Sequence, residues 1–258
     1  MVVIPQLQER RAFECRLTPE RALASLDEAE EFLRDRGMLT RTADSSLPSL
    51  FAAMHEQPYA PGTGGFGEWP RTKYQWSFEL AEREGVYAPK IHRGKTLYMS
   101  EDVARLVDSI CRSEIARMED ADPGWARLLR HLGDTGPALV DDLQVELGLS
   151  PRELRSLRSP LERCGAIVSR MVFVPASHGG HTHTGELARW DQAFPEPAGG
   201  EPDLGPLVVA GVRAAVVAPE RELRRWFSWA WRWEDGLVER LVDEGRLERP
   251  ESGWLAAL

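Results

Sequence analysis

The chain has 258 residues, of which 42% are hydrophobic and 28% charged, a composition typical of a globular protein rather than a disordered one. Its formal net charge of −9 argues against a surface that is basic throughout. The longest apolar stretch, 206–219, is too short for a membrane span, and no secretory signal is evident, so we expect a cytoplasmic protein with no membrane contact. The scattered cysteines Cys15, Cys111 and Cys164 argue against disulfides and a zinc–thiolate site.

The first third of the chain predicts helices followed by a basic hairpin. Thr18-Pro19 is a typical helix start, and apolar residues at helical spacing continue to Gly37. A short helix is expected at 47–54, a glycine- and proline-rich loop at 58–70 and a further helix at about 72–84. Residues 86–99 then predict a β-hairpin with its turn at Arg93-Gly94.

The middle of the chain predicts a helix-turn-helix. A long helix over 101–122 is expected to join it to the first part of the chain. Helices follow at about 125–132 and 140–147, and Ser150-Pro151-Arg152-Glu153 is a capping box that starts a third. This third helix ends at Gly165 and is followed by strand-like residues, an order typical of a helix-turn-helix with a wing.

The last part of the chain follows a linker at 195–206 that is rich in proline and glycine. It predicts an apolar helix at 207–217, an aromatic-rich helix after Pro219, a helix at about 234–244 and a hairpin that turns at Ser252-Gly253. Trp226, Trp229 and Trp233 recur at helical spacing, which favours core packing over a base-stacking surface.

A fixed spacing connects these three parts. Gly85, Gly165 and Gly245 are 80 residues apart, and each follows an amphipathic helix and precedes strand-like residues. We therefore expect a mainly α fold with small β-hairpins, built from three tandem winged helix-turn-helix units: 10–100 with the glycine-rich loop, 123–185 and 203–258, with 101–122 as a connecting helix. The alternative is three unrelated turns whose spacing coincides.

The charge is unevenly distributed between these parts. Residues 86–100, 150–170 and 221–233 each carry +3, which leaves −18 for the remainder. Because phosphate binding depends on local charge, we expect contacts with double-stranded DNA from the wing and from the third helix of the middle unit. The candidate residues are Lys90, His92, Arg93, Lys95, Arg152, Arg155 and Arg158. The alternative is that these cations lie on ordinary solvated faces.

Sites for other chemistry are sparse in the sequence. There is no phosphate-binding glycine loop, zinc-protease motif or serine elbow. His178, His181 and His183 are the best metal candidates, but the glycines between them favour a plain hairpin tip, so no metal or cofactor is expected. His55 and Glu56 form a candidate acid–base pair, for which a structural role is favoured.

The three predicted winged helices resemble the AlkZ/YcaQ-like family of DNA glycosylases. The similarity covers nearly the whole chain as an arrangement, and it is closest over Trp76–Met99 and Leu143–Val174. It implies tandem winged helices and a relation to enzymes that release alkylated or crosslinked bases from DNA. It implies no particular protein partner.

The family's catalytic element, a Gln-x-Gln or Gln-x-Asp triplet in the first unit, has no clear counterpart. The aligned segment, Ser46-Leu47-Pro48-Ser49-Leu50, lacks glutamine and acid, and Gln6-Leu7-Gln8 precedes the first predicted helix. Glu56 and Gln57 beside the glycine-rich loop are the nearest polar candidates. We therefore expect a DNA-binding relative of the glycosylases with weak or no base excision; the alternative is a non-catalytic regulator or damage-recognition protein.

Overall fold

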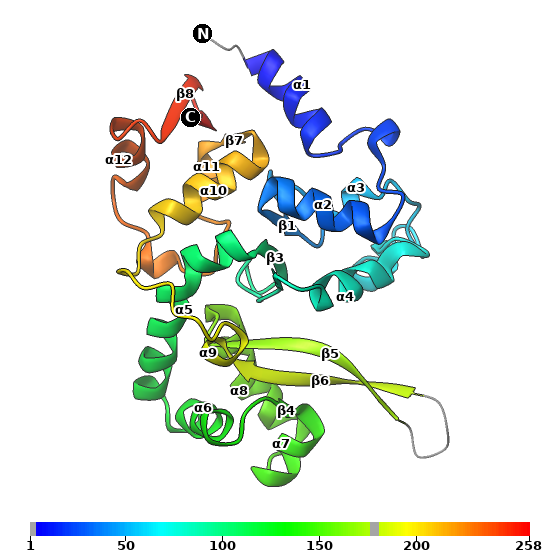
Figure 1. The fold of residues 1–258 in the computed structure, drawn as a ribbon, viewed down its shortest axis with the longest axis vertical. Helices are drawn as coiled ribbons and strands as arrows, with labels where there is room; N and C mark the ends of the chain where they lie inside the picture. Colours follow the sequence, from blue (N-terminus) through cyan, green and yellow to red (C-terminus); the bar gives the residue numbers. More distant parts are fainter. Residues whose placement is uncertain (1–3, 176–180) are drawn as a thin grey trace. The chain divides into compact units, whose positions relative to one another are not determined.

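The computed structural model describes residues 4–175 and 181–258. Within this part, helices alternate with short strands, and the chain divides into two compact units (Figure 1). Unit 1 comprises residues 1–87, 97–106 and 203–258, and unit 2 comprises residues 88–96 and 107–202. The mainly α fold with small β-hairpins is therefore confirmed, whereas the division into three winged-helix units stays a prediction.

Three antiparallel sheets share one topology: in each, the last strand in sequence lies between the other two. Their orders are β1-β3-β2, β4-β6-β5 and β7-β9-β8. The strands are β1 Met38–Thr40, β2 Val86–Tyr87, β3 Leu97–Ser100, β4 Ala138–Leu139, β5 Ile167–Pro175, β6 His181–Arg189, β7 Val217–Pro219, β8 Leu247–Glu251 and β9 Trp254–Ala257. The hairpin of β5 and β6 has the longest strands (Figure 1).

The helices that accompany the three sheets also follow one order: helix, strand, two helices, then two strands. These helices are α2 Leu26–Arg36, α3 Leu50–Ala53 and α4 Trp76–Glu79 for the first sheet, α6 Pro123–Thr135, α7 Val140–Glu146 and α8 Pro151–Cys164 for the second, and α10 Gly205–Ala215, α11 Glu220–Leu223 and α12 Leu237–Asp243 for the third. The remaining α-helices are α1 Ile4–Glu14, α5 Glu101–Ala121 and α9 Trp190–Ala193.

The repeated glycines lie between the helical part of each set and its hairpin: Gly165 and Gly245 follow the ends of α8 and α12, whereas Gly85 follows the 3-10 turn Leu80–Glu82 that succeeds α4. Gly85, Gly165 and Gly245 have φ angles of 73°, 79° and 67°, in the left-handed region that closes a helix without a steric penalty for glycine. Strands β2, β5 and β8 begin one or two residues later. The glycine spacing thus marks a real recurrence of helix, turn and strand.

Two expectations for the first part of the chain were wrong. The Thr18-Pro19 start gives only a 3-10 turn, Pro19–Arg21, whereas α2 begins after Ser25, whose Oγ accepts a 3.1 Å hydrogen bond from the Glu28 N–H. Residues 72–84 do not form one helix: α4 is flanked by the 3-10 turns Lys73–Gln75 and Leu80–Glu82. Helix α1 was not anticipated; its Leu7 packs in a cluster with Val216 and Val217.

The aromatic-rich helix expected after Pro219 does not form, because the helix at this position ends before the tryptophans. Helix α11 ends at Leu223, and Trp226 and Trp229 are buried in the turn segment that follows. A Cβ atom at Gly211 of α10 would lie 2.8 Å from the Trp226 ring, so the missing side chain makes room for the indole. The expected core role of these two tryptophans is confirmed, although the helix that was to carry them is not.

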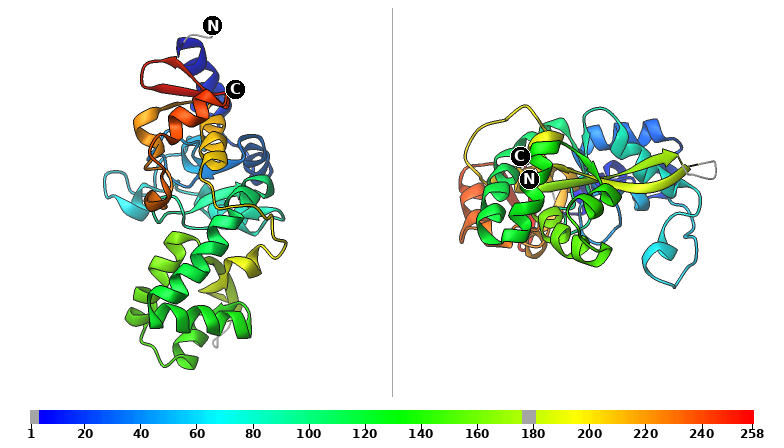
Figure 2. Two further views of the ribbon diagram at one scale, coloured as in Figure 1. Left: turned by 90° about the vertical axis from the view of Figure 1, so that its left-hand side faces the viewer. Right: turned by 90° about the horizontal axis from the view of Figure 1, so that it is seen from below.

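No helix in residues 4–175 and 181–258 is long and apolar enough to cross a bilayer. Figure 2 shows the same ribbon from two further directions, in which the long helix α5 and the β5–β6 hairpin can be followed.

Candidate nucleic-acid interface

Helix α8 of unit 2 presents a row of arginines to solvent. Its start is fixed by the predicted capping box: Ser150 Oγ accepts from the Glu153 N–H, and the Glu153 carboxylate accepts from the Ser150 N–H at 2.8 Å. Leu154 and Leu161 are buried on one side. Arg152 and Arg155 are exposed on the other, as the spacing predicts.

Arg163 belongs to the same row, although it was not among the predicted contacts. It lies eleven residues, or about three turns, after Arg152, which places it on the same face of an α-helix, and it is exposed. We call Arg152, Arg155 and Arg163 the arginine face. Within the described part of the chain, none of the three side chains makes a hydrogen bond or ion pair.

Arg158 lies apart from the arginine face. It is half-buried, and its Nη1 atom lies 3.8 Å from the position that a Cβ atom would take at Gly185 of β6. The prediction from every third residue therefore included Arg158, which points toward the hairpin, and did not include Arg163. The helical period of 3.6 residues, applied over three turns, would have found it.

The two acidic residues of α8 do not neutralise the arginine face. Glu153 is held in the capping box, and hydrogen bonds from the Ser150 side chain and then from its backbone hold the pKa of Glu153 below its ordinary value. The Glu162 side chain is 7% exposed and lies 2.7 Å from Lys90 Nζ. Glu153 thus stays ionised, but the three exposed arginines outnumber this one exposed carboxylate, so the net exposed charge of the helix is positive.

The segment 88–96 belongs to the same unit and brings some of the predicted wing residues near α8. Arg93 and Gly94, at φ 54° and 77°, form a tight turn closed by two backbone hydrogen bonds between His92 and Lys95. The Cγ and Cδ atoms of Arg163 lie 3.9 Å from the position that a Cβ atom would take at Gly94. Lys95 is exposed beside this turn.

The side chains of Lys90 and His92 are not available for contact with a phosphate in solvent. His92 is fully buried, so its ring is removed from solvent. Lys90 is engaged by the buried carboxylate of Glu162. The sequence reasoning missed this because the alternation of polar residues in a short hairpin does not reveal which side packs on a helix.

The catalytic candidates near the glycine-rich loop lie in unit 1 and have structural contacts. The Glu56 carboxylate accepts hydrogen bonds from the Thr72 hydroxyl, the Thr72 N–H and the Lys73 N–H, at the start of the 3-10 turn. Partial burial acts to raise the pKa of Glu56, but these hydrogen bonds outweigh it and lower the pKa. Gln57 is exposed, and its carbonyl accepts from the Arg71 N–H. The adjacent His55 ring bonds the Arg16 carbonyl through Nε2.

The Gln-x-Gln letters of the sequence lie within α1 rather than before the first helix. Gln6 is exposed and Gln8 half-buried, on either side of the buried Leu7. Among the described residues, no hydrogen bond connects Gln6 or Gln8 with Glu56 or Gln57. The structure therefore does not assemble the four candidates into one polar site through direct contacts.

A carboxylate that the sequence did not suggest lies beside Ser46, in the segment that was expected to correspond to the family's triplet. The N–H and Oγ of Ser46 both donate to Glu222 Oε2, each at 2.8 Å. Glu222 comes from α11, 176 residues further along the chain, and both residues belong to unit 1. Only the tertiary fold brings this acid to Ser46.

The histidine candidates for a metal are only partly described. His178 lies outside the described residues, whereas His181 and His183 lie two positions apart on β6. His183 is exposed. Among the residues that the structure describes, no three histidine, cysteine or acidic side chains form a group that could hold a metal ion.

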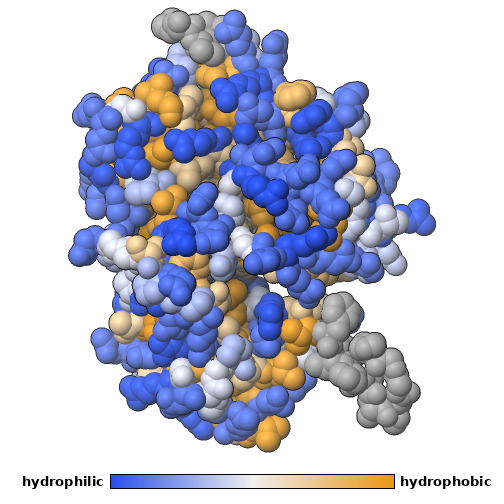
Figure 3. Space-filling view, viewed as in Figure 1, coloured by the Kyte–Doolittle hydropathy of each residue, from blue (hydrophilic) through white to orange (hydrophobic). Residues whose placement is uncertain are grey.

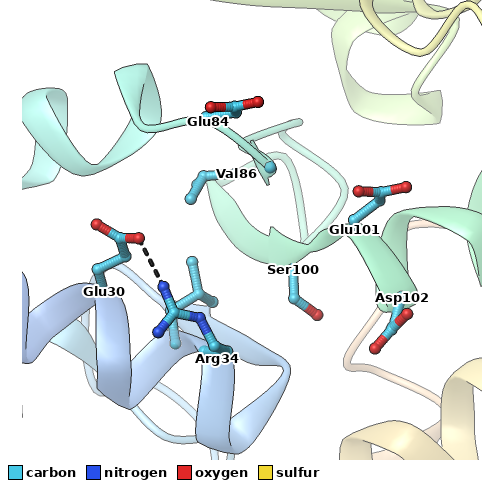
Figure 4. Close-up of a pocket in the computed structure, with 9 residues that line it drawn as sticks. Glu30, Arg34, Glu84, Val86, Ser100, Glu101 and Asp102 are labelled. Atoms are coloured by element: carbon cyan, nitrogen blue, oxygen red, sulfur yellow. Dashed lines mark hydrogen bonds and ion pairs between the residues drawn. The ribbon is translucent and has the colours of Figure 1, made fainter.

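A cavity of about 290 Å³ in unit 1 has the wrong charge for a phosphate (Figure 4). Its lining includes four carboxylates and one arginine, and that arginine, Arg34, is paired with Glu30 at 2.8 Å. The carboxylates are those of Glu30, Glu84, Glu101 and Asp102. The face of the molecule in Figure 3 is mainly hydrophilic, with hydrophobic residues in small groups. The arginine face is thus the better candidate for binding a polyanion.

Comparison with known proteins gives a similarity at the level of the fold. No protein-family model and no curated protein sequence matches the chain. Among solved structures, the DNA glycosylase AlkZ of Streptomyces sahachiroi is similar, with a TM-score of 0.55 and 14% sequence identity over 99% of this chain and 70% of that one. The chain therefore has a fold similar to that of a DNA glycosylase, and the expected resemblance is confirmed at that level.

Proposed function

We propose that this protein binds double-stranded DNA through the arginine face of α8, as a relative of the DNA glycosylases. The observation that carries the proposal is a capped helix with three exposed arginines that have no carboxylate partner in the described part of the chain. Arginine is well suited to phosphate because its planar guanidinium offers several donors. The similarity in fold to the DNA glycosylase AlkZ supports the same partner.

In this proposal the three recurrent sets of helices and sheets are winged helix-turn-helix units. Each has the order helix, strand, helix, helix and hairpin, with the last strand central in its sheet. Helix α8 then corresponds to the helix that enters or borders a DNA groove, and β5–β6 is its wing. Of the helices that directly precede the three hairpins, α8 is the longest at 14 residues, so we assign the main contact to it.

The proposal is tested by titrating the protein with a fluorescent duplex at several salt concentrations. Replacing one phosphate-contacting arginine, Arg155→Ala, should weaken binding about equally for all sequences and reduce the salt slope by about one. Arg34→Ala is the matched control, because Arg34 is exposed but paired with Glu30. Equal binding by wild type and Arg155→Ala at every salt concentration would contradict the assignment.

Hydrolysis of an N-glycosidic bond is a second candidate function, favoured by the Glu222 carboxylate beside Ser46. A carboxylate can orient a water and stabilise the positive charge that develops on the sugar. The carboxylate is already used to hold the Ser46 turn, so we expect weak or no excision of alkylated purines. An abasic-site assay on alkylated duplex decides this point. If excision occurs, Glu222→Gln should abolish it, whereas Glu220→Gln on the same helix should not.

A further inference from the structure

Unit 1 carries a cluster of aromatic rings on and beside the glycine-rich loop. Phe66 lies 4.5 Å from Trp69, 5.7 Å from Tyr74 and 6.5 Å from Tyr59, measured between ring centroids. Tyr59 and Phe66 are 62% and 53% exposed. We call these four residues the aromatic platform. Exposed large rings in one contiguous group indicate a binding surface, whereas single exposed rings do not.

Deeper rings support the platform from below. Trp69 lies 5.4 Å from Phe51 and 6.3 Å from Phe78, again between centroids. Phe51 is buried, whereas Trp69 and Phe78 are half-buried. The exposed rings are therefore an extension of the core of unit 1 and are held in place by packing.

The backbone of the loop is also ordered. The Tyr59 N–H donates to the Trp69 carbonyl at 2.8 Å, and the Ala60 N–H donates to the Gly67 carbonyl at 2.7 Å. Gly62 and Gly64 turn the chain with φ angles of 79° and 72°. Because the loop is closed by these bonds, a ligand that stacks on the rings would not have to order a flexible segment first.

Two arginines lie beside the platform, together with the exposed carboxylate of Glu68, which accepts a hydrogen bond from the Gly62 N–H. The Arg41 guanidinium lies 5.2 Å from the Trp69 ring centroid and 5.6 Å from that of Phe78, and its Nε donates to the Tyr98 hydroxyl at 3.1 Å. Arg41 has no ion pair with any carboxylate in the described part of the chain. Arg71 is exposed at the end of the loop, and the nearby carboxylate of Glu56 is occupied by backbone and hydroxyl donors.

We propose that the aromatic platform stacks an unpaired base of a DNA strand, with Arg41 and Arg71 near that strand's phosphates. Exposed rings beside arginines that have no ion pair in the described part of the chain are a combination that suits single-stranded nucleic acid, because every base has a face that can stack. Aromatic rings also occur at protein interfaces, and it is the two arginines beside these rings that favour a ligand that carries phosphates. This inference depends on the proposed function and adds to it a preference for DNA that contains an unpaired base.

The test compares three probes: a fully paired duplex, the same duplex with one unpaired thymine, and single-stranded oligo(dT). Wild type should bind the duplex with the unpaired thymine and the oligo(dT) about tenfold or more tightly than the platform variant Tyr59→Ala/Phe66→Ala does. The two proteins should bind the fully paired duplex equally. Phe13→Ala is the matched control, because Phe13 is 59% exposed and lies outside the platform.

Two further variants separate stacking from simple hydrophobic contact. Phe66→Trp should retain the affinity for the unpaired thymine, whereas Phe66→Leu, which keeps apolar area without a ring, should weaken it toward the level of the platform variant. If Phe66→Leu binds the unpaired thymine as wild type does, ring stacking at Phe66 does not hold the base and the proposal is overturned.

The paired duplex distinguishes the two proposals. If wild type binds paired duplex but gains nothing from an unpaired thymine, the platform proposal fails and the proposed function stands. If wild type binds none of the three probes, both fail. Equal losses by the platform variant on all three probes would also overturn the platform proposal.

Discussion

Lys90 shows how a residue selected for its charge acquires a different role in the folded chain. Its ammonium lies 2.7 Å from a Glu162 carboxylate that is nearly inaccessible to solvent. A buried carboxylate that loses its partner is strongly destabilising, because the charge has been taken from water without compensation. The sequence gives no sign of this, since the partners are 72 residues apart.

We expect Lys90→Ala to lower the free energy of unfolding by about 2 to 3 kcal/mol, less than for a fully buried pair because the Lys90 side chain is 33% exposed. Arg155→Ala, which removes no contact in the described part of the chain, should change it by less than about 0.5 kcal/mol. Urea unfolding of the two variants measures this difference. The double variant Lys90→Met/Glu162→Leu should recover most of the loss, and equal effects of the two alanine variants would contradict the ion pair's role.

The Glu56 carboxylate predicts a specific dependence of stability on pH. Its pKa in the folded protein lies below the ordinary value of 4.5, so the folded state favours the ionised form. Its contribution is complete above pH 4.5 and is lost as the pH falls through the lower, folded pKa.

Wild type should therefore be more stable than Glu56→Gln at pH 7, and the two should converge as the pH falls below 4.5. Chemical denaturation at a series of pH values checks this. Glu79→Gln is the control, because Glu79 is exposed and makes no hydrogen bond in the described residues. A difference between wild type and Glu56→Gln that stays constant down to pH 3 would contradict the proposed role of the carboxylate.

At the scale of elements, local signals predicted those helices and turns whose ends are fixed by their own residues. The capping box of α8 and the Ser252-Gly253 turn are of this kind. The segment after α11 was misjudged because the spacing of its tryptophans fits a helix equally well. Its conformation is set by packing, for example of Trp226 on Gly211, which no local signal reports.

For the candidate site too, the sequence predicted the features that depend on local pattern and not those that depend on tertiary contacts. The exposure of Arg152 and Arg155 follows from the pattern of α8, which buries Leu154 and Leu161. The burial of His92 and the contact of Glu222 with Ser46 depend on distant parts of the chain. Sequence periodicity identifies faces, but it does not identify which face meets another element.

Gly245 permits a clean test of the repeated helix end. Its φ is 67°, and a Cβ atom added there would meet nothing within 4 Å, so only the backbone conformation opposes a side chain. We expect Gly245→Ala to lower the free energy of unfolding by about 1 kcal/mol and Gly245→Asn by less, because asparagine tolerates left-handed backbone better. Thermal and urea unfolding provide the measurement. If alanine is tolerated as well as asparagine, the left-handed turn is not what limits this position.

For the whole molecule, the central question is how a protein of net charge −9 would bind a polyanion. Many of its arginines are already paired with acids on the same helix, as Arg10 is with Glu14, Arg34 with Glu30 and Arg105 with Glu101. Such exposed pairs have little net field at a distance, because the opposite charges are adjacent and solvent screens them. The arginine face lacks this compensation, so it should determine DNA binding despite the overall charge.

Two triple variants with the same total charge separate local from global electrostatics. Arg152→Gln/Arg155→Gln/Arg163→Gln and Arg10→Gln/Arg34→Gln/Arg105→Gln each change the net charge from −9 to −12. If local charge governs binding, the first set should reduce the salt slope for duplex DNA by about 2.7, roughly 0.9 for each lost phosphate contact, and the second should leave it nearly unchanged. Fluorescence anisotropy titrations between low and physiological salt measure both slopes. Equal weakening by the two sets would mean that the overall field governs the encounter, and the interface would then have to be sought away from α8.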